Sequence, residues 1–191
     1  MSDIPIVSGI ILAAGLSRRF GAENKLLAPW RGRPLASYAI EAAMNSAIQD
    51  VVLVTGQDGD AVADLATAAK FHRVHNPNFA DGLSSSLRAG LAAAPQGPVM
   101  VLLADMPMVT PPLIASLLGA WREGAYALVP EYQGQGGNPV ILGDAARADA
   151  MALTDDRGAR GLFKGRTDVI RHPVLDKATL RDFDSSEDFA V

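Results

Sequence analysis

"ILAAGLSRRFGAENKLL", residues 11–27, is the stretch from which the fold can be read. It continues an apolar run that starts at Val7, passes through Gly15 and Gly21 into a group of cations, and then returns to leucines. An apolar run of this length is typical of a buried strand. The glycines that follow it allow a ligand to approach the backbone closely. The stretch therefore predicts a first strand that leads into a ligand-binding loop.

The rest of the chain alternates short apolar runs with Ala- and Leu-rich segments of helical length, as βα units around a mostly parallel sheet do. The expected strands are Val7–Ala13, Val51–Val54, His72–His75, Val99–Leu103, Ala127–Pro130, Pro139–Leu142 and Val169–Pro173. The expected helices are Leu35–Ala47, Asp60–Ala69, Leu83–Ala93, Pro112–Arg122, Asp144–Ala152 and Ala159–Lys164.

One segment departs from this alternation. "PEYQGQGGNPV", residues 130–140, joins two strands without a helix, which favours an antiparallel hairpin. We therefore expect an α/β fold: a three-layer α/β/α sandwich whose mostly parallel, Rossmann-like sheet contains an antiparallel strand. At 191 residues, 49% of them hydrophobic, the chain suits a single domain over residues 1–191.

Composition excludes several classes of function. The net charge of -4 argues against binding to nucleic acid or to a membrane surface, because both require a basic face. The absence of cysteine excludes disulfides, thiolate metal sites and thiol nucleophiles, and it fits a cytoplasmic protein. Any anion-binding site must therefore be local.

The loop after the first strand has the composition of such a local site. In open α/β sheets, ligands bind beyond the carboxyl ends of the strands. Arg19 can bind phosphate oxygens as a bidentate fork and Lys25 as a point charge. Neither of the two common phosphate-loop patterns, G-x-x-x-x-G-K-[ST] and G-x-G-x-x-G, is present. The alternative is a solvated turn whose basic residues have no ligand.

"LAAGLSRRFG", residues 12–21, followed by Lys25, resembles the L-A-A-G-x-S-x-R-F-G…K signature of the MobA-like NTP transferase family, in particular its molybdenum cofactor cytidylyltransferases, which have a GT-A-like fold. The resemblance implies that the loop wraps a nucleoside triphosphate and that Arg19 and Lys25 are catalytic. The nucleotide-binding residues that it implies here are Leu12, Ala13, Ala14, Gly15, Arg19 and Lys25. Related guanylyltransferases read L-A-G-G, so Ala14 implies CTP rather than GTP.

Two carboxylates are candidates for binding a metal. Asp105 ends the apolar run "VMVLLADMPMV", residues 99–109, where it suits either Mg²⁺ or a turn before Met106. The family's L-x-D-M/Q-P pattern implies that Asp105 is catalytic and a metal ligand. "RDFDSSEDFA", residues 181–190, is similar to the family's D-I-D-T-P-E-D segment, which implies Asp184 as the second ligand, with Asp182 as the alternative. Without the resemblance, Asp184 or Ser185 reads as a helix cap.

The segment "NPNFADGLSSSLRAGLAA", residues 76–93, matches the family's G-x-S-S-S-L-x-x-G-L pattern. The match implies that Ser86 approaches the base of the nucleotide and that Gly82 packs beside it. The alternative is that the serines only cap a helix. For Arg88 the sequence leaves open a ligand contact or an ion pair.

Two later segments are similar to acceptor-side loops of the family. "GQGGNPVIL", residues 134–142, resembles G-x-x-G-H-P-V, and "DDRGARGLF", residues 155–163, resembles G-D-x-G-A-R. They imply Asn138, Asp156 and Arg160 as acceptor-binding residues. Asn138 stands where many members have histidine, and Asp155 replaces the glycine of the second pattern. A hairpin turn and a capped helix are the alternatives.

The resemblance implies a Mg²⁺-dependent enzyme that transfers CMP from CTP to molybdenum-molybdopterin, releasing molybdopterin cytosine dinucleotide and pyrophosphate. An NTP transferase that acts on another phosphorylated small molecule, such as a sugar phosphate, is an alternative. A second alternative is a non-catalytic protein that delivers the cofactor to a molybdenum hydroxylase, which would then be its partner.

Overall fold

The computed structural model describes residues 6–16, 20, 24–154 and 158–190. Across this part of the chain, the main sheet has eight strands: β1 (Ser8–Ala13), β4 (Val51–Thr55), β5 (Phe71–His75), β6 (Val99–Leu103), β7 (Ala127–Tyr132), β8 (Gln135–Gly136), β9 (Val140–Leu142) and β10 (Val169–Pro173). Two short strands, β2 (Pro29–Trp30) and β3 (Arg33–Pro34), form a separate antiparallel pair.

The strand order in the main sheet is β10-β7-β9-β6-β1-β4-β5, with β8 paired to β7. The pairs β1–β4, β1–β6, β4–β5 and β7–β10 are parallel. β9 runs antiparallel to both of its neighbours, β6 and β7. This arrangement confirms the expected mostly parallel sheet with an antiparallel strand, and it places the antiparallel hairpin where the sequence lacks a helix.

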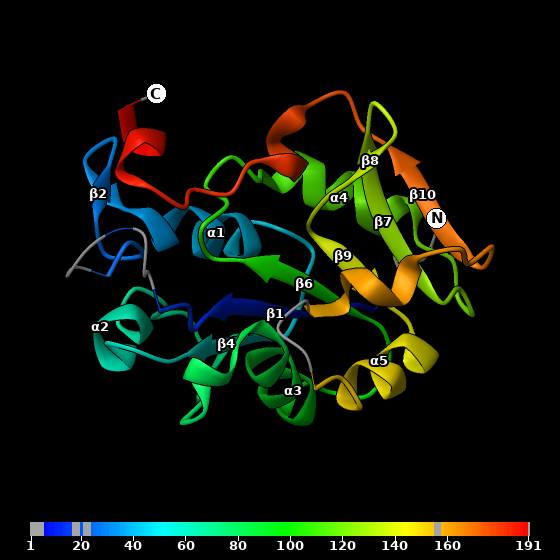
Figure 1. The fold of residues 1–191 in the computed structure, drawn as a ribbon, viewed down its shortest axis with the longest axis horizontal. Coiled ribbons are helices and arrows are strands. Elements are labelled where there is room, and N and C mark those ends of the chain that lie inside the picture. The colour runs from blue at the N-terminus through cyan, green and yellow to red at the C-terminus, as the bar shows by residue number, and fades with distance from the viewer. Residues whose placement is uncertain (1–5, 17–19, 21–23, 155–157, 191) are drawn as a thin grey trace.

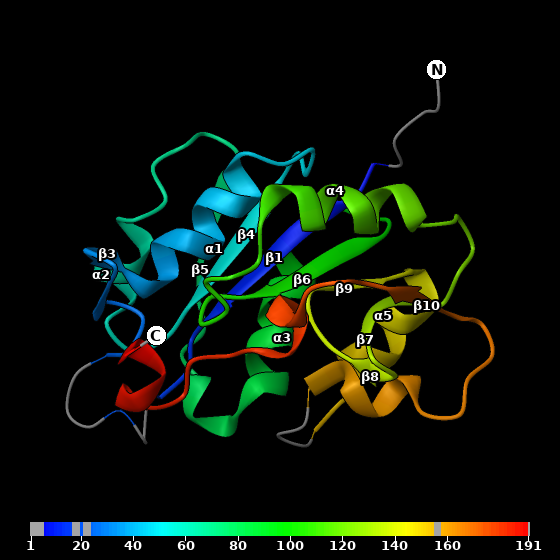
Figure 2. The same cartoon turned by 90° about the horizontal axis from the view of Figure 1, so that it is seen from above.

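The α-helices are α1 (Leu35–Met44), α2 (Gly59–Ala63), α3 (Leu83–Ala93), α4 (Pro111–Ala120) and α5 (Asp144–Met151), and the 3₁₀ helices are η1 (Phe79–Asp81), η2 (Gly158–Phe163), η3 (Lys177–Leu180) and η4 (Ser186–Ala190). Figures 1 and 2 show α1 and α4 on one face of the sheet and α3 and α5 on the other. None of the helices within the described ranges is long and apolar enough to cross a membrane.

The two faces of the sheet bury alternate residues of the same strands. Ile11 of β1 belongs to the core beneath α1 and α4, whereas Ile10 and Leu12 belong to the core beneath α3 and α5. Side chains of a strand point alternately to opposite faces, so an uninterrupted apolar run fills both cores. The three-layer sandwich follows from this pattern.

Two helix predictions differ from the structure. The helix expected at Asp60–Ala69 ends at Ala63, and the chain then makes tighter turns, in which the amide of Leu65 donates to the carbonyl of Val62 (3.2 Å) and the amide of Ala66 to that of Ala63 (3.0 Å). The helix expected at Ala159–Lys164 is the 3₁₀ helix η2. Both segments are short, and short helices depend on tertiary contacts more than on sequence propensity.

The carboxyl ends of β1 and β6 lie side by side, since the amide of Ala104 donates to the carbonyl of Leu12 (3.1 Å). The C-terminal segment crosses the same end of the sheet, where the amide of Phe183 donates to the carbonyl of Asp105 (3.0 Å). Phe183 is fully buried against Trp30 and its neighbours. Three distant parts of the sequence therefore meet at one edge of the sheet.

Candidate active site

Two cavities open at this edge and share Leu12, Leu83, Leu103 and Asp182 in their walls. The first, of about 390 Å³, is called here the glycine-loop cavity, and its polar end is formed by Gly15, Lys25, Gly82, Ser86, Asp105 and Asp184. The second, of about 450 Å³, is called the hairpin cavity, and its polar wall includes Gly137, Asn138, Arg160, Lys164, Arg171 and Thr179. The shared wall means that molecules in the two cavities would be neighbours.

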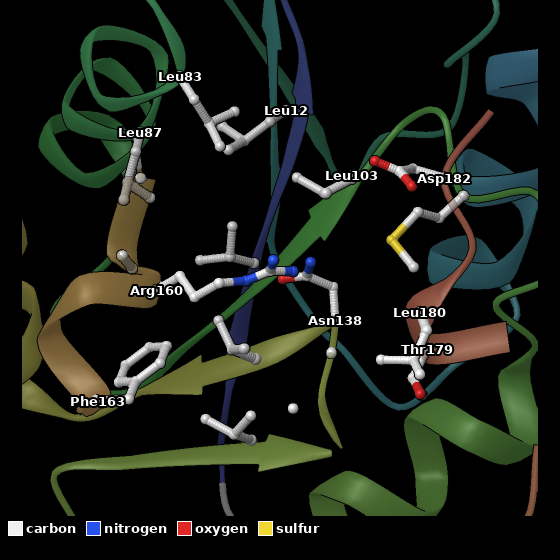
Figure 3. Close-up of a pocket in the computed structure, with 18 of the residues that line it drawn as sticks. Leu12, Leu83, Leu87, Leu103, Asn138, Arg160, Phe163, Thr179, Leu180 and Asp182 are labelled. Atoms are coloured by element: carbon white, nitrogen blue, oxygen red, sulfur yellow. The ribbon is translucent and has the colours of Figure 1, made fainter. Parts of the chain in front are cut away.

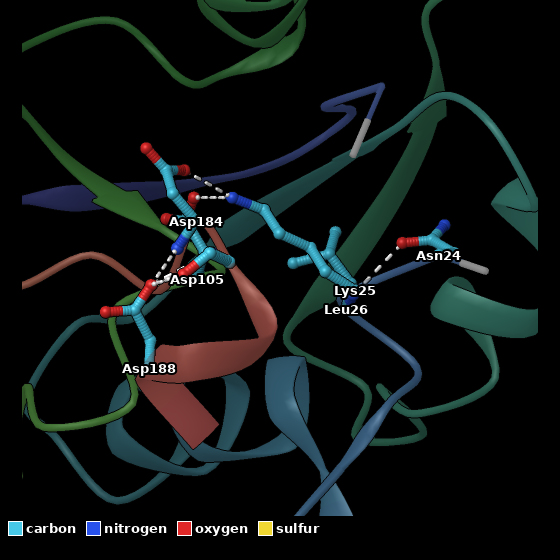
Figure 4. A network of polar contacts seen from close by, with 7 residues as sticks. Asn24, Lys25, Leu26, Asp105, Asp184 and Asp188 are labelled. Atoms are coloured by element: carbon cyan, nitrogen blue, oxygen red, sulfur yellow. Dashed lines mark hydrogen bonds and ion pairs between the residues drawn. The ribbon is translucent and has the colours of Figure 1, made fainter. Parts of the chain in front are cut away.

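An ion-pair triad lies at the end of the glycine-loop cavity (Figure 4). The Nζ atom of Lys25 is 2.8 Å from Oδ2 of Asp105 and 2.9 Å from Oδ1 of Asp184. Lys25 is only 7% exposed, and the Asp105 side chain is 21% exposed. The sequence separations are 80 and 159 residues. The structure therefore brings together three of the residues that the sequence nominated.

Lys25 and Asp105 both have shifted pKa values. Burial alone would lower the pKa of Lys25, but the charges of Asp105 and Asp184 and the hydrogen bonds to them outweigh it, so the pKa is raised above its ordinary value. Burial raises the pKa of Asp105, and the neighbouring Lys25 ammonium opposes this effect. Lys25 is thus held as a cation, and its charge favours the ionised form of Asp105 against the effect of burial.

Lys25 is positioned by a neighbour that the sequence analysis did not single out. Asn24 is buried, and its Oδ1 accepts from the amide of Leu26 (3.0 Å). Its Nδ2 donates to the carbonyl of Gln57 (3.1 Å) and to Asp58 (3.3 Å). These bonds tie the start of the lysine segment to the loop after β4. The only signal in the sequence is a polar residue directly before the lysine.

Asp184 is positioned by Asp188. Oδ2 of Asp188 accepts from the amides of Asp184 and Ser185 (both 2.9 Å) and from the Ser185 hydroxyl (3.1 Å). These bonds, first among them the one from the Ser185 amide, lower the pKa of Asp188. This is the acidic half of a capping box at the start of η4. The cap that the sequence suggested and the ion pair of Asp184 therefore coexist.

Asp182 and Asp184 flank the buried Phe183. Phe183 packs into the aromatic cluster with Trp30, whereas both flanking carboxylates line the glycine-loop cavity. Asp184 reaches Lys25, whereas Asp182 lines the wall shared by the two cavities. Asp182 also lines the glycine-loop cavity together with Asp105 and Asp184, so both Asp184 and Asp182 remain candidates for the second metal ligand.

The triad fits a divalent cation. Asp105 and Asp184 aim oxygens at one point, which the Lys25 ammonium occupies, and carboxylates are ligands that Mg²⁺ prefers. Among the residues that are described, no group of three or more His, Cys, Asp or Glu could hold a metal alone. Because Mg²⁺ often binds through one or two carboxylates plus substrate phosphates, two carboxylates suit an ion that arrives with a nucleotide.

The serine run lies at the start of α3, as expected. Gly82, before the helix, has φ of +99°, a conformation that favours glycine. Ser86 lines the glycine-loop cavity, and its hydroxyl accepts from Nδ2 of Asn76 (3.0 Å). Ser84 accepts from the amide of Gly158 (3.2 Å), which links α3 to the hairpin cavity. The sequence left open a ligand contact or an ion pair for Arg88. In the structure its side chain instead donates to the carbonyl of Leu153.

The residues at the end of β1 and directly after it divide between the two faces of the sheet. Leu12, Ala14 and Gly15 line the glycine-loop cavity. Ala13 points into the opposite core and does not line either cavity, so any contact with a nucleotide would come from its backbone. Arg19 and Asp156, which the sequence nominated for the nucleotide and the acceptor, lie outside the described residues.

The side chains of Asn138 and Arg160 point toward each other across the hairpin cavity (Figure 3). The amide of Asn138 donates to the carbonyl of Thr179 (2.8 Å), which attaches this loop to η3. A Cβ on Gly137 would lie 2.1 Å from the same carbonyl, so only glycine fits there. The geometry thus places two of the acceptor candidates in one cavity, next to the triad.

Comparisons with known proteins support the resemblance. A nicotine blue oxidoreductase from Paenarthrobacter nicotinovorans is 32% identical over 197 residues, covering 97% of this chain and 96% of its own. The molybdenum cofactor cytidylyltransferase of Escherichia coli (strain K12) is 26% identical over 182 residues, which cover 94% of this chain and 92% of the E. coli protein. The crystal structure of an Rv0371c homologue from Mycobacterium sp. strain JC1 matches with a TM-score of 0.82 at 28% identity. The match covers 96% of this chain and 93% of the mycobacterial chain.

The sequence also matches the MobA-like NTP transferase domain over residues 9–172, which reaches every strand of the main sheet. The match covers the glycine loop, Asp105, the serine run and the hairpin, and it ends before Asp184. It confirms the family that the motifs indicated: the chain belongs to the MobA-like NTP transferase domain family.

Proposed function

We propose that this protein transfers CMP from CTP to molybdenum-molybdopterin, with Mg²⁺ as the metal, to give molybdopterin cytosine dinucleotide and pyrophosphate. The observation that carries the proposal is the triad of Lys25, Asp105 and Asp184 at the end of a cavity lined by Gly15 and Ser86. A cation and a carboxylate pair beside a glycine loop suit a metal-bound triphosphate. The similarity to the E. coli cytidylyltransferase supports the choice of nucleotide and acceptor.

The reaction requires little covalent participation by the protein. An acceptor phosphate oxygen attacks the α-phosphorus of CTP, a new O–P bond forms, and the bond to the β-phosphate breaks with its electron pair leaving on pyrophosphate. A phosphate monoester is already anionic near neutral pH, with a second pKa of about 6, so no general base is needed. The protein's contribution is to position the two substrates and to neutralise charge.

Each residue of the candidate active site then has a role. Lys25 exchanges its carboxylates for the phosphate oxygens of CTP and balances the charge of the leaving pyrophosphate. Asp105 and Asp184 would hold Mg²⁺, which supplies charge neutralisation on the triphosphate. Ala14 and Ser86 line the space for the nucleotide. The resemblance to the family implies that Arg19 binds the same triphosphate. Asn138 and Arg160 orient the acceptor in the neighbouring cavity.

A second candidate is an oxidoreductase, because the relative at 32% identity carries that name and is matched over nearly its whole length. The chain has no cysteine, so a redox reaction could not use a dithiol and would need a bound reductant. A nicotinamide dinucleotide has the nucleotide and diphosphate groups that the glycine-loop cavity suits. In this case the carboxylate pair would have no metal-triphosphate to bind.

Pyrophosphate release separates these functions. The purified protein is incubated with CTP, GTP, ATP or UTP and Mg²⁺, with and without molybdenum-molybdopterin, and NADPH or NADH oxidation is measured in parallel. The proposal expects pyrophosphate only with CTP and the acceptor together. Turnover with a sugar phosphate would indicate another transferase, and binding of the cofactor without release would indicate a delivery protein. Oxidation of NADPH or NADH with an electron acceptor would favour the oxidoreductase.

Lys25→Ala tests the site itself, and Lys177→Ala is its matched control, because Lys177 is exposed and lines neither cavity. Loss of the Lys25 cation should slow transfer by about 100-fold or more, as single charge-stabilising groups do in other enzymes. A Lys25→Ala protein with full activity would contradict the assigned role. The control should retain the parent rate.

A further inference from the structure

Asn76 is a buried asparagine behind the wall of the glycine-loop cavity. It directly follows β5, and its backbone amide donates to the carbonyl of Thr55 at the end of β4 (2.8 Å). Asn76 is only 3% exposed and lines neither cavity. Buried polar side chains are nearly always hydrogen-bonded, because desolvation without a partner is costly. The partners of Asn76 lie in the loop that follows it and at the start of α3.

The side-chain amide of Asn76 has a single orientation that satisfies these partners. Oδ1 accepts from the backbone amide of Asn78 (3.0 Å), and a backbone N–H can only donate. The oxygen is therefore fixed on the side of Asn78, and Nδ2 faces α3. Nδ2 donates to the hydroxyls of Ser85 (2.9 Å) and Ser86 (3.0 Å), which uses both of its hydrogens. Both serine oxygens thus act as acceptors toward Asn76.

The two serines differ in what they do with their own protons. A hydroxyl that accepts from Nδ2 still has one proton to donate. The Ser85 hydroxyl donates to the carbonyls of Asn78 (2.8 Å) and Gly82 (2.9 Å). The Ser86 hydroxyl has no second hydrogen-bond partner within the described ranges, and Ser86 lines the glycine-loop cavity. Its proton is therefore available to a molecule in that cavity.

The edge of a nucleobase responds to such a proton. On cytosine, O2 and N3 are neighbouring acceptors, whereas the 4-amino group is a donor. A donor in the cavity wall is satisfied by the acceptor half of this edge. Ser86 is only 3% exposed, so a hydroxyl proton that faced an amino group would stay unpaired in a buried place, which weakens binding.

We propose that Asn76 is a positioning residue for nucleotide selection, which holds the Ser86 hydroxyl as a hydrogen-bond donor toward a base edge that presents an acceptor. Asn76 acts through Ser86 and does not itself contact the ligand. The inference deepens the proposed function and rests on it in one respect, namely that the glycine-loop cavity takes a nucleotide.

Asn76→Asp reverses the proposed polarity with little change of shape. The substitution keeps the oxygen that accepts from Asn78 and replaces Nδ2 by a second acceptor. The Ser86 proton then turns to the carboxylate, and the hydroxyl presents only lone pairs to the cavity. Two acceptors, the serine oxygen and the base, would then face each other.

Binding is measured by isothermal titration calorimetry in Mg²⁺ with two probes. α,β-Methylene-CTP carries the base, whereas tripolyphosphate lacks base and ribose, so the ratio of the two affinities isolates the nucleoside. We expect Asn76→Asp to bind the CTP analogue at least about tenfold more weakly than the parent, which corresponds to about 1.4 kcal/mol. Its affinity for tripolyphosphate should stay within about twofold of the parent.

Ser86→Ala provides a readout that a structural role of Asn76 would not move. Alone, this substitution removes one hydrogen bond to the base and should weaken binding of the CTP analogue about two- to tenfold. Added to Asn76→Asp, it removes the reversed hydroxyl, so the double variant should bind the analogue more tightly than Asn76→Asp and about as well as Ser86→Ala. If Asn76 only supported the fold, the two losses would add.

Asn78→Asp is the matched control, because it makes the same chemical change two residues away. Asn78 is exposed, its side chain does not cap η1, and it lines neither cavity. The control should bind both probes like the parent. Thermal unfolding shows which variants are folded at the assay temperature. Asn76→Ala is the second variant: it only releases the hydroxyl, so its loss should be smaller than that of Asn76→Asp and should vanish when Ser86→Ala is added.

The inference and the proposed function fail in different ways. A parental ratio of affinities in both Asn76 variants, or no recovery when Ser86→Ala is added to Asn76→Asp, would overturn the inference, and turnover of CTP would still support the transferase. Recovery without pyrophosphate release from CTP and any acceptor would support the inference and contradict the transferase. Equal affinity of the parent for the CTP analogue and tripolyphosphate would show that the base is not bound, which would also overturn the inference.

Discussion

Replacing Lys25 by methionine removes an ammonium group from between two carboxylates while keeping much of the apolar stem. The Nζ atom lies 2.8 and 2.9 Å from the oxygens of Asp105 and Asp184. At an effective dielectric constant of about 20, each contact corresponds to roughly 6 kcal/mol of Coulomb energy, most of which offsets the cost of burial. Removing one member of a buried ion pair typically costs about 3–5 kcal/mol. Because the Asp184 side chain is 45% exposed, we expect about 3 kcal/mol, the lower end of that range.

The expected loss is measured by thermal and urea unfolding in EDTA. A chain of this size changes its unfolding temperature by about 2–4 °C per kcal/mol, so Lys25→Met should unfold roughly 6–12 °C below the parent. Lys177→Met, an exposed lysine outside both cavities, is the control and should unfold with the parent. The comparison distinguishes the loss of stability caused by breaking the triad from the effect of removing a positive charge anywhere on the protein.

Mg²⁺ provides the second half of the test. Without the ammonium, Asp105 and Asp184 are available to a divalent cation even when no nucleotide is present. Mg²⁺ at about 100 times its dissociation constant should restore about 2.7 kcal/mol to Lys25→Met, and it should stabilise the parent less, because there it competes with the lysine. Unfolding of Lys25→Met at the parent temperature in EDTA, with no response to Mg²⁺, would refute the reasoning.

Three further predictions concern the surroundings of the triad and the sheet. Gly137→Ala places a methyl group against a backbone carbonyl 2.1 Å away, so the KM for the acceptor should rise at least about tenfold while nucleotide binding is unchanged. Phe183→Ala should lower the free energy of unfolding by about 4 kcal/mol and also weaken Mg²⁺–CTP binding, because the flanking aspartates lose their fixed direction. Burial, assisted by a 2.7 Å hydrogen bond to Asp149, raises the pKa of Tyr126 to about 12. Its stabilising contribution is therefore present below about pH 10 and lost between about pH 10 and 12, so Tyr126→Phe should be about 2 kcal/mol less stable at pH 7 and the difference should vanish towards pH 12.

Each of these predictions has a control. Gly119→Ala adds the same methyl group where nothing lies within 4 Å, and it should leave the KM unchanged. Phe183→Leu keeps much of the buried volume and should retain CTP binding better than the alanine variant. An unchanged acceptor KM in Gly137→Ala, or parental stability and CTP binding in Phe183→Ala, would contradict the packing argument. A Tyr126→Phe difference that stays constant with pH would show that ionisation of the phenol does not contribute.

Much of the fold can be predicted from local pattern. Apolar runs fill both cores of a parallel sheet, so the strands expected at Val99–Leu103 and Val169–Pro173 agree with the structure to the residue. The antiparallel hairpin follows from turn residues and the absence of a helix. The helix expected at Asp60–Ala69 is too long, since it ends at Ala63 and is followed by turns with i→i−3 hydrogen bonds. Short helices depend on tertiary packing, which local propensity does not describe.

The sequence by itself determined which chemical groups are available: a glycine loop followed by Lys25, a carboxylate at the end of a buried strand, and an acidic C-terminal segment. Only the tertiary structure decided how they combine. It paired Lys25 with Asp184 across 159 residues, assigned Asp182 to the wall between the cavities, and made Asn24 and Asp188 the residues that hold the triad. The physical reason is that residue type and spacing set local conformation, whereas contacts between residues far apart in the sequence, such as the packing of Phe183 against Trp30, bring the acidic C-terminal segment to the carboxyl ends of β1 and β6.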